Sequence, residues 1–369
     1  MNGIEHITLH RLRVPLREPY VLSIGTVRVL DTVLVEAHDT HGETGYGEAT
    51  VLSGYTHETS DGTWSRVQEL ASAILGLDPA PALDRLAPHT KDAPFTVTAL
   101  ATAVEILQGI EIDFPRPRTI PLVALIKGRR QGDLEAEIEN YWADGYRTFK
   151  IKVGFGVVED LERVGLIQRL NAARARLRID ANQGYSREEA LHFAAALEPD
   201  GVELLEQTCD AGDWDAAVAV ARAARVPMML DESIYGPEDV ERAAELGAAR
   251  FIKFKLMKAG GLARLKDALA RIRALGMTPV LGNGVAADVG CWLETVACAA
   301  WLDNAGEMNG FLKTARALVV NPLRVHGGAI QLPAHYRPEI AHDRVEQYRT
   351  DLVELGGNRP AARTSGTRS

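Results

Sequence analysis

The sequence from Thr119 onward repeats a strand and a helix about every 25 residues, and this period restricts the fold more than any other feature. Amphipathic segments such as 157–172 and 261–275 alternate with apolar runs, a pattern that indicates helices between buried strands. Strictly alternating units require parallel strands, and about eight of them favour a closed barrel over an open doubly wound sheet. No glycine-rich turn follows the first strand, so a dinucleotide-binding sheet fits less well. The apolar runs lie at 120–126, 148–153, 176–180, 202–206, 227–231, 250–256 and 278–281, with a weaker candidate at 305–308.

Five of these runs end on a charged residue. Lys152, Asp180, Glu206, Asp231 and Lys255 follow one another at intervals of 28, 26, 25 and 24 residues. Parallel strands of a barrel expose their carboxyl ends on one face, so we expect these five side chains to meet there. Three carboxylates on neighbouring strands are suitable ligands for Mg²⁺. The alternative, three independent helix N-caps, fits the two aspartates but not the glutamate, which is a poor cap.

Two pairs of lysines flank the carboxylates. Lys150 and Lys152 lie two residues apart, so both point into the barrel if the KIK segment is a strand. A neighbouring positive charge disfavours protonation, and we expect this to lower the pKa of one lysine toward neutrality, where it can act as a general base. Lys253 and Lys255 repeat the pair beyond the carboxylates. We expect Lys253, one layer deeper, to form an ion pair with an inward carboxylate.

Two amide residues follow the proposed metal ligands directly. Asn182 lies two residues after Asp180, and Gln207 follows Glu206. Ligating carboxylates need hydrogen-bonding partners that orient them, and we predict this role for both amides.

The first part of the chain follows another pattern. The segment ITLHRLRVPL alternates, two further strands surround a polar Asp-Thr-His-Gly turn, and 63–76 and 96–110 have the pattern of helices. The two prolines in DFPRPRTI mark a boundary. We therefore predict an α+β domain at 1–117, a barrel with the active site at 118–325, a segment at 326–355 that packs back on the first domain, and a disordered tail at 356–369.

Composition excludes several functions. The net charge of −9 argues against broad binding of nucleic acids. Cys209, Cys291 and Cys298 form no CxxC pair, which suits a reducing compartment. The first residues lack a signal-peptide pattern, and no run of 18 uncharged apolar residues occurs. We expect a soluble cytoplasmic protein with no membrane or nucleic-acid partner.

The motifs KIK, DANQ, LLEQ, LDES and KLMKAGG, in this order and spacing, resemble the enolase superfamily, specifically its muconate lactonizing enzyme subgroup. The resemblance covers about residues 5–330. It implies an α/β fold, a (β/α)₇β barrel of TIM type beneath an N-terminal α+β capping domain, and a homo-oligomer. It implies Mg²⁺, with Mn²⁺ as a substitute, at Asp180, Glu206 and Asp231, proton transfer by Lys152 and Lys255, and support from Lys150. The mandelate racemase subgroup would instead carry a His–Asp pair, whereas GNGVAAD contains Asp288 but no histidine.

The resemblance also places substrate recognition in two capping-domain loops, around residues 20–25 and 53–57. Tyr20, Ile24 and Tyr55 are candidates for the walls of the site, or alternatively for the core of the capping domain. Asn283 and Glu307 continue the register at the later strand ends. In amino-acid epimerases of this subgroup an acidic residue near Glu307 holds the substrate ammonium group, within an Asp-x-Asp pattern. This chain has Glu-Met-Asn there.

A basic loop, LIKGRRQGD, follows the first barrel strand. Lys127, Arg129 and Arg130 could bind a second anionic group of the substrate, or they could form a basic loop exposed to water.

The leading functional hypothesis is Mg²⁺-dependent removal of the proton α to a carboxylate, through an enolate, by a racemase, epimerase or cycloisomerase. The substrate would be an amino-acid-like or other small carboxylic acid. Dehydration of a hydroxy acid at the same site is the alternative enzyme. A non-catalytic binding protein does not explain why all five charged side chains are present, and a phosphotransferase would need a phosphate-binding glycine-rich loop.

Overall fold

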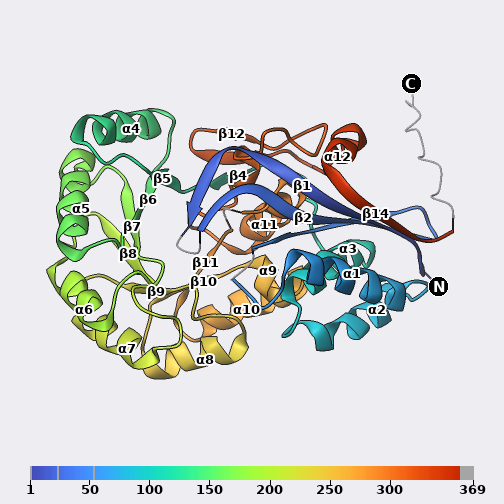
Figure 1. The fold of residues 1–369 in the computed structure, drawn as a ribbon, viewed down its shortest axis with the longest axis horizontal. Helices are drawn as coiled ribbons and strands as arrows, with labels where there is room; N and C mark the ends of the chain where they lie inside the picture. Colours follow the sequence, from blue (N-terminus) through green and yellow to red (C-terminus); the bar gives the residue numbers. More distant parts are fainter. Residues whose placement is uncertain (1, 23–24, 53–54, 284, 358–369) are drawn as a thin grey trace.

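The computed structural model describes residues 2–22, 25–52, 55–283 and 285–357. Its N-terminal part is a four-stranded antiparallel sheet in the order β14-β1-β2-β3, which crosses the right half of the view in Figure 1. The strands are β1 (Ile4–Leu22), β2 (Gly25–Asp39), β3 (Thr44–Val51) and β14 (Arg349–Gly356). Residues from the two ends of the described chain therefore share one sheet.

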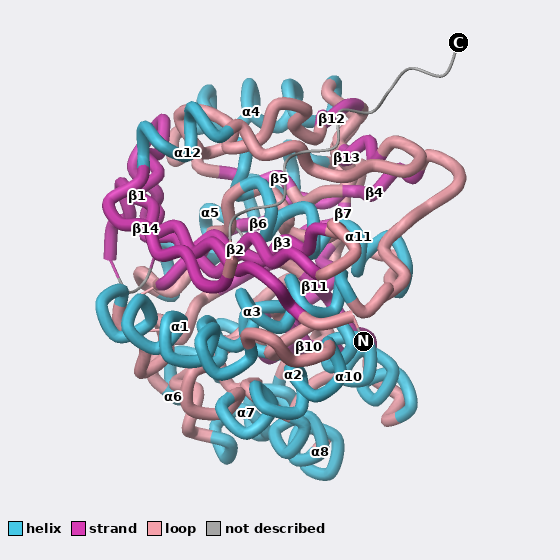
Figure 2. The backbone as a smooth tube through the Cα atoms, turned by 90° about the vertical axis from the view of Figure 1, so that its right-hand side faces the viewer, coloured by secondary structure: helices cyan, strands magenta, loops and turns pink. Residues whose placement is uncertain are grey.

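Helices α1 (Ser60–Ile74), α2 (Pro79–Leu86) and α3 (Pro94–Leu107) cover one face of this sheet (Figure 2). Apolar residues alternate along the strands, and those on this face pack against the helices in one core. Gly47 of β3 lets α3 approach closely, because a Cβ atom there would lie 1.8 Å from the carbonyl oxygen of Ala99. The two helices predicted at 63–76 and 96–110 are found with earlier starts, whereas α2 was not expected.

The second part is a seven-stranded parallel sheet in the order β11-β10-β9-β8-β7-β6-β5, curled into a half-barrel (Figure 1). Burial on both faces explains why its strands are continuous apolar runs. They are β5 (Ala124–Ile126), β6 (Thr148–Lys152), β7 (Arg176–Asp180), β8 (Val202–Glu206), β9 (Met228–Leu230), β10 (Phe251–Phe254) and β11 (Thr278–Leu281).

Helices connect these strands and lie on the outside of the curl (Figure 1). The segments predicted at 157–172 and 261–275 are α5 and α10. The helices are α4 (Gln131–Ala143), α5 (Val157–Asn171), α6 (Arg187–Ala196), α7 (Trp214–Ala223), α8 (Pro237–Leu246), α9 (Leu256–Ala259), α10 (Leu262–Ala274) and α11 (Asp288–Trp301).

Two predicted barrel strands differ from the structure. The run at 120–126 is divided into β4 (Arg118–Pro121) and β5, and β4 joins an antiparallel sheet with β12 (Arg324–His326) and β13 (Ala329–Leu332). The candidate at 305–308 forms a single bridge from Gly306 to Leu122 rather than a strand. Its backbone nevertheless reaches both edges of the curl, because Gly306 N–H donates to the oxygen of Pro121 at 3.0 Å and Glu307 N–H donates to that of Leu281 at 3.3 Å.

Carboxylates of the N-terminal part contact the first turns of two outer helices. Glu48 of β3 accepts from the N–H groups of Ala287 and Gly290 at 2.7 and 2.9 Å. Glu105 of α3 accepts from those of Leu262 and Ala263 at 2.6 and 2.9 Å. Exposed N–H groups at a helix start favour such acceptors. These contacts fix the N-terminal part against α10 and α11.

The C-terminal segment pairs with two different sheets. Strand β13 pairs with β4, whereas β14 pairs with β1, and α12 (His342–Tyr348) lies between them in the sequence. Gly356 is the last residue of β14, although the predicted tail begins there, and 358–369 lie outside the described residues. No helix in the described part of the chain is long and apolar enough to cross a membrane. The three cysteines are buried free thiols.

Candidate active site

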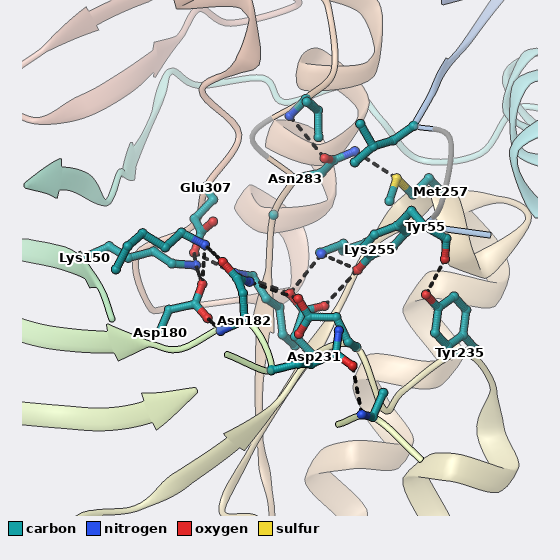
Figure 3. A pocket seen from close by; sticks show the side chains of 18 of the residues that line it. Tyr55, Lys150, Asp180, Asn182, Asp231, Tyr235, Lys255, Met257, Asn283 and Glu307 are labelled. Atoms are coloured by element: carbon teal, nitrogen blue, oxygen red, sulfur yellow. Dashed lines mark hydrogen bonds and ion pairs between the residues drawn. The ribbon is translucent and has the colours of Figure 1, made fainter. Parts of the chain in front are cut away.

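Strand register places charged side chains in one row at the carboxyl ends of β6, β7 and β8. Lys152 lies beside Asp180, and Asp180 lies beside Glu206. Asp231 follows β9 and Lys255 follows β10. Lys152, Asp180, Asp231 and Lys255 line a cavity of about 270 Å³, in which Figure 3 labels Asp180, Asp231 and Lys255. Glu206 is buried beside Lys150 and Lys253, which also line the cavity. Its lining also includes Tyr20, Leu52, Tyr55, Lys150, Asn182, Gln183, Ala211, Glu232, Tyr235, Lys253, Met257, Gly282, Asn283, Val285 and Glu307.

One side of the site is organised around Lys150, which is buried. Its Nζ lies 2.8 Å from Asp180 Oδ2, 3.0 Å from Glu206 Oε2 and 2.9 Å from Glu307 Oε1. Lys152 Nζ lies 2.6 Å from the same Asp180 oxygen. Lys253 pairs with Glu206 at 3.0 Å and with Glu307 at 2.6 Å, as its deeper position on the strand predicted.

The opposite side is organised around Asp231. Lys255 Nζ lies 2.8 Å from Asp231 Oδ2 and also donates to the Tyr55 hydroxyl, which itself donates to Asp231 Oδ1 at 3.1 Å. Lys258, fully buried behind them, donates to the backbone oxygens of Asp231 and Ile234 at 2.8 and 2.7 Å. In Figure 3, Asp180 and Asn182 lie on one side of the cavity, and Lys255 and Tyr55 on the other.

These ion pairs determine the electrostatics. Burial alone would raise the pKa of Asp180, but Lys150 and Lys152 hold it at about 2. Burial would likewise lower the pKa of Lys150, but Asp180, Glu206 and Glu307 raise it well above its ordinary value. The pKa of Lys255 is raised in the same way, chiefly by Asp231. Lys150 is therefore not the lysine of the Lys150–Lys152 pair whose pKa falls, because carboxylates from other strands outweigh the neighbouring ammonium group. The lowered pKa of one lysine in the pair stays a prediction.

Sequence reasoning missed Glu232 and Lys258. Glu232 is buried, and burial together with the charge of Asp231 raises its pKa to about 7. Asn182 connects the two sides, since its side-chain oxygen accepts from Lys152 and its Nδ2 donates to Glu232 at 2.9 Å. The signal for Glu232 was its place next to Asp231 in LDES. The signal for Lys258 was its place in KLMKAGG, three residues after Lys255, although only the fold shows that it contacts the turn at Asp231.

The two predicted orienting residues act differently. Asn182 orients Asp180 through its backbone, since its N–H donates to Asp180 Oδ1 at 2.9 Å. The side chain of Gln207 makes no hydrogen bond to a carboxylate of the described residues; its Oε1 accepts from the N–H groups of Asp231 and Ser233 at 3.0 and 3.2 Å. Gln207 thus fixes the turn that carries Asp231.

The predicted recognition residues have different environments. Tyr20 lines the cavity, and Lys313 Nζ lies 3.9 Å from the centre of its ring. Asn283 lines the wall near Met257, with its Nδ2 3.1 Å from the sulfur. Glu307 reaches the site but is paired with two lysines. Ile24 lies outside the described residues.

The residues of the basic loop have different positions. Lys127 is exposed and lines a second cavity of about 290 Å³, whose walls also include Lys150, Lys152 and Glu307 of the site. Its Nζ lies 3.9 Å from the exposed Glu18. Arg129 is also exposed and stacks over Phe155, and Arg130 is exposed at the start of α4.

The carboxylates fit a divalent cation by their chemistry. Asp180, Glu206 and Asp231 are almost completely buried. Glu206 Oε2 makes no hydrogen bond to any described residue, although Lys150 Nζ is 3.0 Å away, because the angle is unsuitable. Within the described chain no three acidic, histidine or cysteine side chains already stand in a metal-binding arrangement. Lysine ammonium groups lie between the carboxylates instead, so the side chains would have to shift to bind a cation.

Comparisons with known proteins agree with this architecture. Residues 133–338, more than half of the chain, match the family described as enolase C-terminal domain-like. The chain is 28% identical to the L-Ala-D/L-Glu epimerase of Bacillus subtilis, over 78% of this chain and 82% of the relative. It is 26% identical to muconate cycloisomerase 1-2 of Acinetobacter lwoffii, over 89% and 90%.

A solved structure shows the same fold. The dipeptide epimerase of Cytophaga hutchinsonii, in complex with Mg and the dipeptide D-Ala-L-Val, superposes with a TM-score of 0.85 at 22% identity, covering 96% of this chain and all of that one. The chain therefore belongs to the enolase C-terminal domain-like family, among the isomerases of its muconate lactonizing enzyme group.

Proposed function

We propose that this protein is a divalent-metal-dependent isomerase that removes and returns the proton α to the carboxylate of a small amino-acid derivative. One observation carries the proposal. Lys152 and Lys255 enter the same cavity from opposite ends of a row of three buried carboxylates, paired with Asp180 on one side and with Asp231 on the other.

The cation would be held by Asp180, Glu206 and Asp231, as Mg²⁺ or, in its place, Mn²⁺. The site contains five buried or half-buried lysines and five carboxylates. Their formal charges therefore balance when no cation is bound. When bound, such a cation neutralises the developing negative charge of the substrate and lowers the pKa of nearby lysines. The five lysines are Lys150, Lys152, Lys253, Lys255 and Lys258, and the carboxylates are Asp180, Glu206, Asp231, Glu232 and Glu307.

The residues of the chain have separate tasks in the proposed reaction. Lys152 takes the proton from one face of the α carbon, and Lys255 returns a proton to the other face, which inverts the centre. Lys150 keeps Asp180 and Glu206 in place, and its positive charge stabilises an enolate nearby. The Tyr55 hydroxyl holds Lys255 toward the cavity.

The proposed barrel is completed by 305–307. We propose that this short segment closes the curl, since its backbone bonds to both edges of the sheet. The proposed division into a capping domain at 1–117 and a barrel at 118–325, with 326–355 returning to the cap, follows from the same connections. Closure would hold Glu307 beside Lys150 and Lys253.

Glu307 is proposed to set the substrate class. A substrate ammonium group could share the Glu307 carboxylate with the two lysines, which supports amino-acid derivatives such as dipeptides over simple acids. The epimerase names of the relatives support the same class.

Deuterium exchange tests the proposal. Each enantiomer of a panel of dipeptides, N-acylated amino acids and hydroxy acids would be incubated with the enzyme and Mg²⁺ in D₂O, and α-deuterium measured by mass spectrometry. We expect exchange with at least one compound, complete loss for Lys152→Ala with one enantiomer, and complete loss for Lys255→Ala with the other. Equal loss from both enantiomers would refute the two-faced arrangement. A keto acid trapped by semicarbazide would instead indicate dehydration at this site.

A further inference from the structure

The backbone around Lys152, one of the two proposed proton-transfer lysines, is held by a charged side chain of an outer helix. Behind Lys152 this side chain is Arg163 of α5. Its Nη1 donates to the carbonyl oxygen of Lys152 at 3.0 Å, its Nη2 to that of Ile126 at 3.2 Å, and its Nε to that of Gly128 at 3.1 Å. One guanidinium group therefore joins the ends of β5 and β6.

The residues after Lys152 are fixed from the same helix. Asp160 Oδ2 accepts from the N–H groups of Gly154, Phe155 and Gly156 at 2.8, 2.9 and 3.1 Å. The carbonyl of Lys152 and the turn that follows it thus both depend on α5.

The chemistry of Arg163 matches the backbone groups that it holds, because a carbonyl oxygen needs a donor and Arg163 supplies three. Arg163 does not line the cavity, so it is not placed to touch a substrate.

We propose that Arg163 is a positioning residue that aims Lys152 at one face of the substrate. The proposal rests on the proposed function, because it assigns Arg163 to one of the two proton transfers. A displacement of about 1 Å at a reacting group can cost about 100-fold in rate. The loss should therefore appear in kcat and should affect one enantiomer only.

The test compares α-deuterium exchange of the two enantiomers. Arg163→Met is expected to slow exchange about 10- to 100-fold for the enantiomer that Lys152→Ala blocks, and to leave the other within about twofold. Arg163→Lys keeps the positive charge but cannot reach three carbonyl oxygens, and it should recover little of the rate. KM should stay within about twofold for every variant, since the cavity wall is unchanged.

A matched control separates positioning from general damage. Arg169→Met removes an exposed arginine from the same helix α5 and should leave the ratio of the two exchange rates unchanged. Equal slowing of both enantiomers by Arg163→Met would overturn the positioning role alone. Absence of exchange by the wild-type enzyme with every compound would overturn the proposed function and this role with it.

Discussion

Glu48, which joins the N-terminal part to α11, should make the free energy of unfolding depend on pH. The variant Glu48→Gln, which cannot titrate, tests this. The side chain is 4% exposed and faces the first turn of α11. Two effects compete there. Burial favours the protonated carboxyl group, whereas the N–H groups of Ala287 and Gly290 favour the carboxylate. Burial prevails and raises the pKa of Glu48 from 4.5 to about 7, with a smaller contribution from Asp288.

The expected magnitude follows from that difference. Between pH 4.5 and about 7 the native protein retains a proton that the unfolded chain has released, so the free energy of unfolding falls as pH rises through this window. A change from 4.5 to about 7 corresponds to roughly 3 kcal/mol. The glutamine variant cannot titrate here. The free energy of unfolding of the variant minus that of wild type should therefore rise by roughly 3 kcal/mol as the pH increases across this window.

Urea denaturation followed by tryptophan fluorescence provides the assay, because Trp292 is buried on the same helix. Wild type and variant would be compared at half-unit steps from about pH 4.5 to about pH 8, so that the other titrating groups cancel in the difference. A difference that is independent of pH would refute a raised pKa. A difference of the opposite sign would show that the helix N-terminus holds Glu48 as a carboxylate.

Three other predictions concern docking, packing and the cation. Glu105→Ala leaves two buried N–H groups of α10 without their acceptor and should lower the free energy of unfolding by about 2 to 5 kcal/mol, measured by chemical denaturation. Gly47→Ala should lower the free energy of unfolding by about 1 to 3 kcal/mol or more, because the new methyl group meets the Ala99 carbonyl. Gly132→Ala, with open space around its Cβ position, should be tolerated. Comparable melting temperatures for the two variants would contradict the close approach of α3 to β3. Treatment with EDTA should abolish α-deuterium exchange and added Mg²⁺ should restore it, while Glu206→Gln should weaken Mg²⁺ binding measured by calorimetry; full exchange by the EDTA-treated protein would exclude a metal requirement.

The sequence predicted the central strands well because their environment is simple. Strands β6, β7 and β8 are buried in a parallel sheet, so each appears as an uninterrupted apolar run that ends at a charged residue. The register then brings Lys152, Asp180 and Glu206 side by side without further information. Local pattern was sufficient wherever the neighbours in space were also the next units in the chain.

Prediction from the sequence failed where a segment pairs with residues that are distant in the chain. The run at 120–126 is divided because its first half pairs with residues 329–332, which no local pattern can reveal. The predicted strand at 305–308 contains Gly306 and is too short and polar to form more than one bridge. The raised pKa of Lys150 could not be predicted for the same reason: its nearest charge in sequence is Lys152, whereas carboxylates of other strands lie against it in space.

The pairing of β14 with β1 imposes an order on folding during synthesis. Strand β14, residues 349–356, is an edge strand of the N-terminal sheet and pairs with the first half of β1. That sheet therefore lacks a strand until nearly all of the described chain has left the ribosome. Pairing between such distant segments is slow, since a long loop must close first. The strands and helices of the half-barrel lie between these segments and have mostly local partners. In the nascent chain, the half-barrel would therefore fold before the N-terminal sheet is complete. Until β14 pairs with it, the free edge of β1 would be exposed to aggregation or to chaperones.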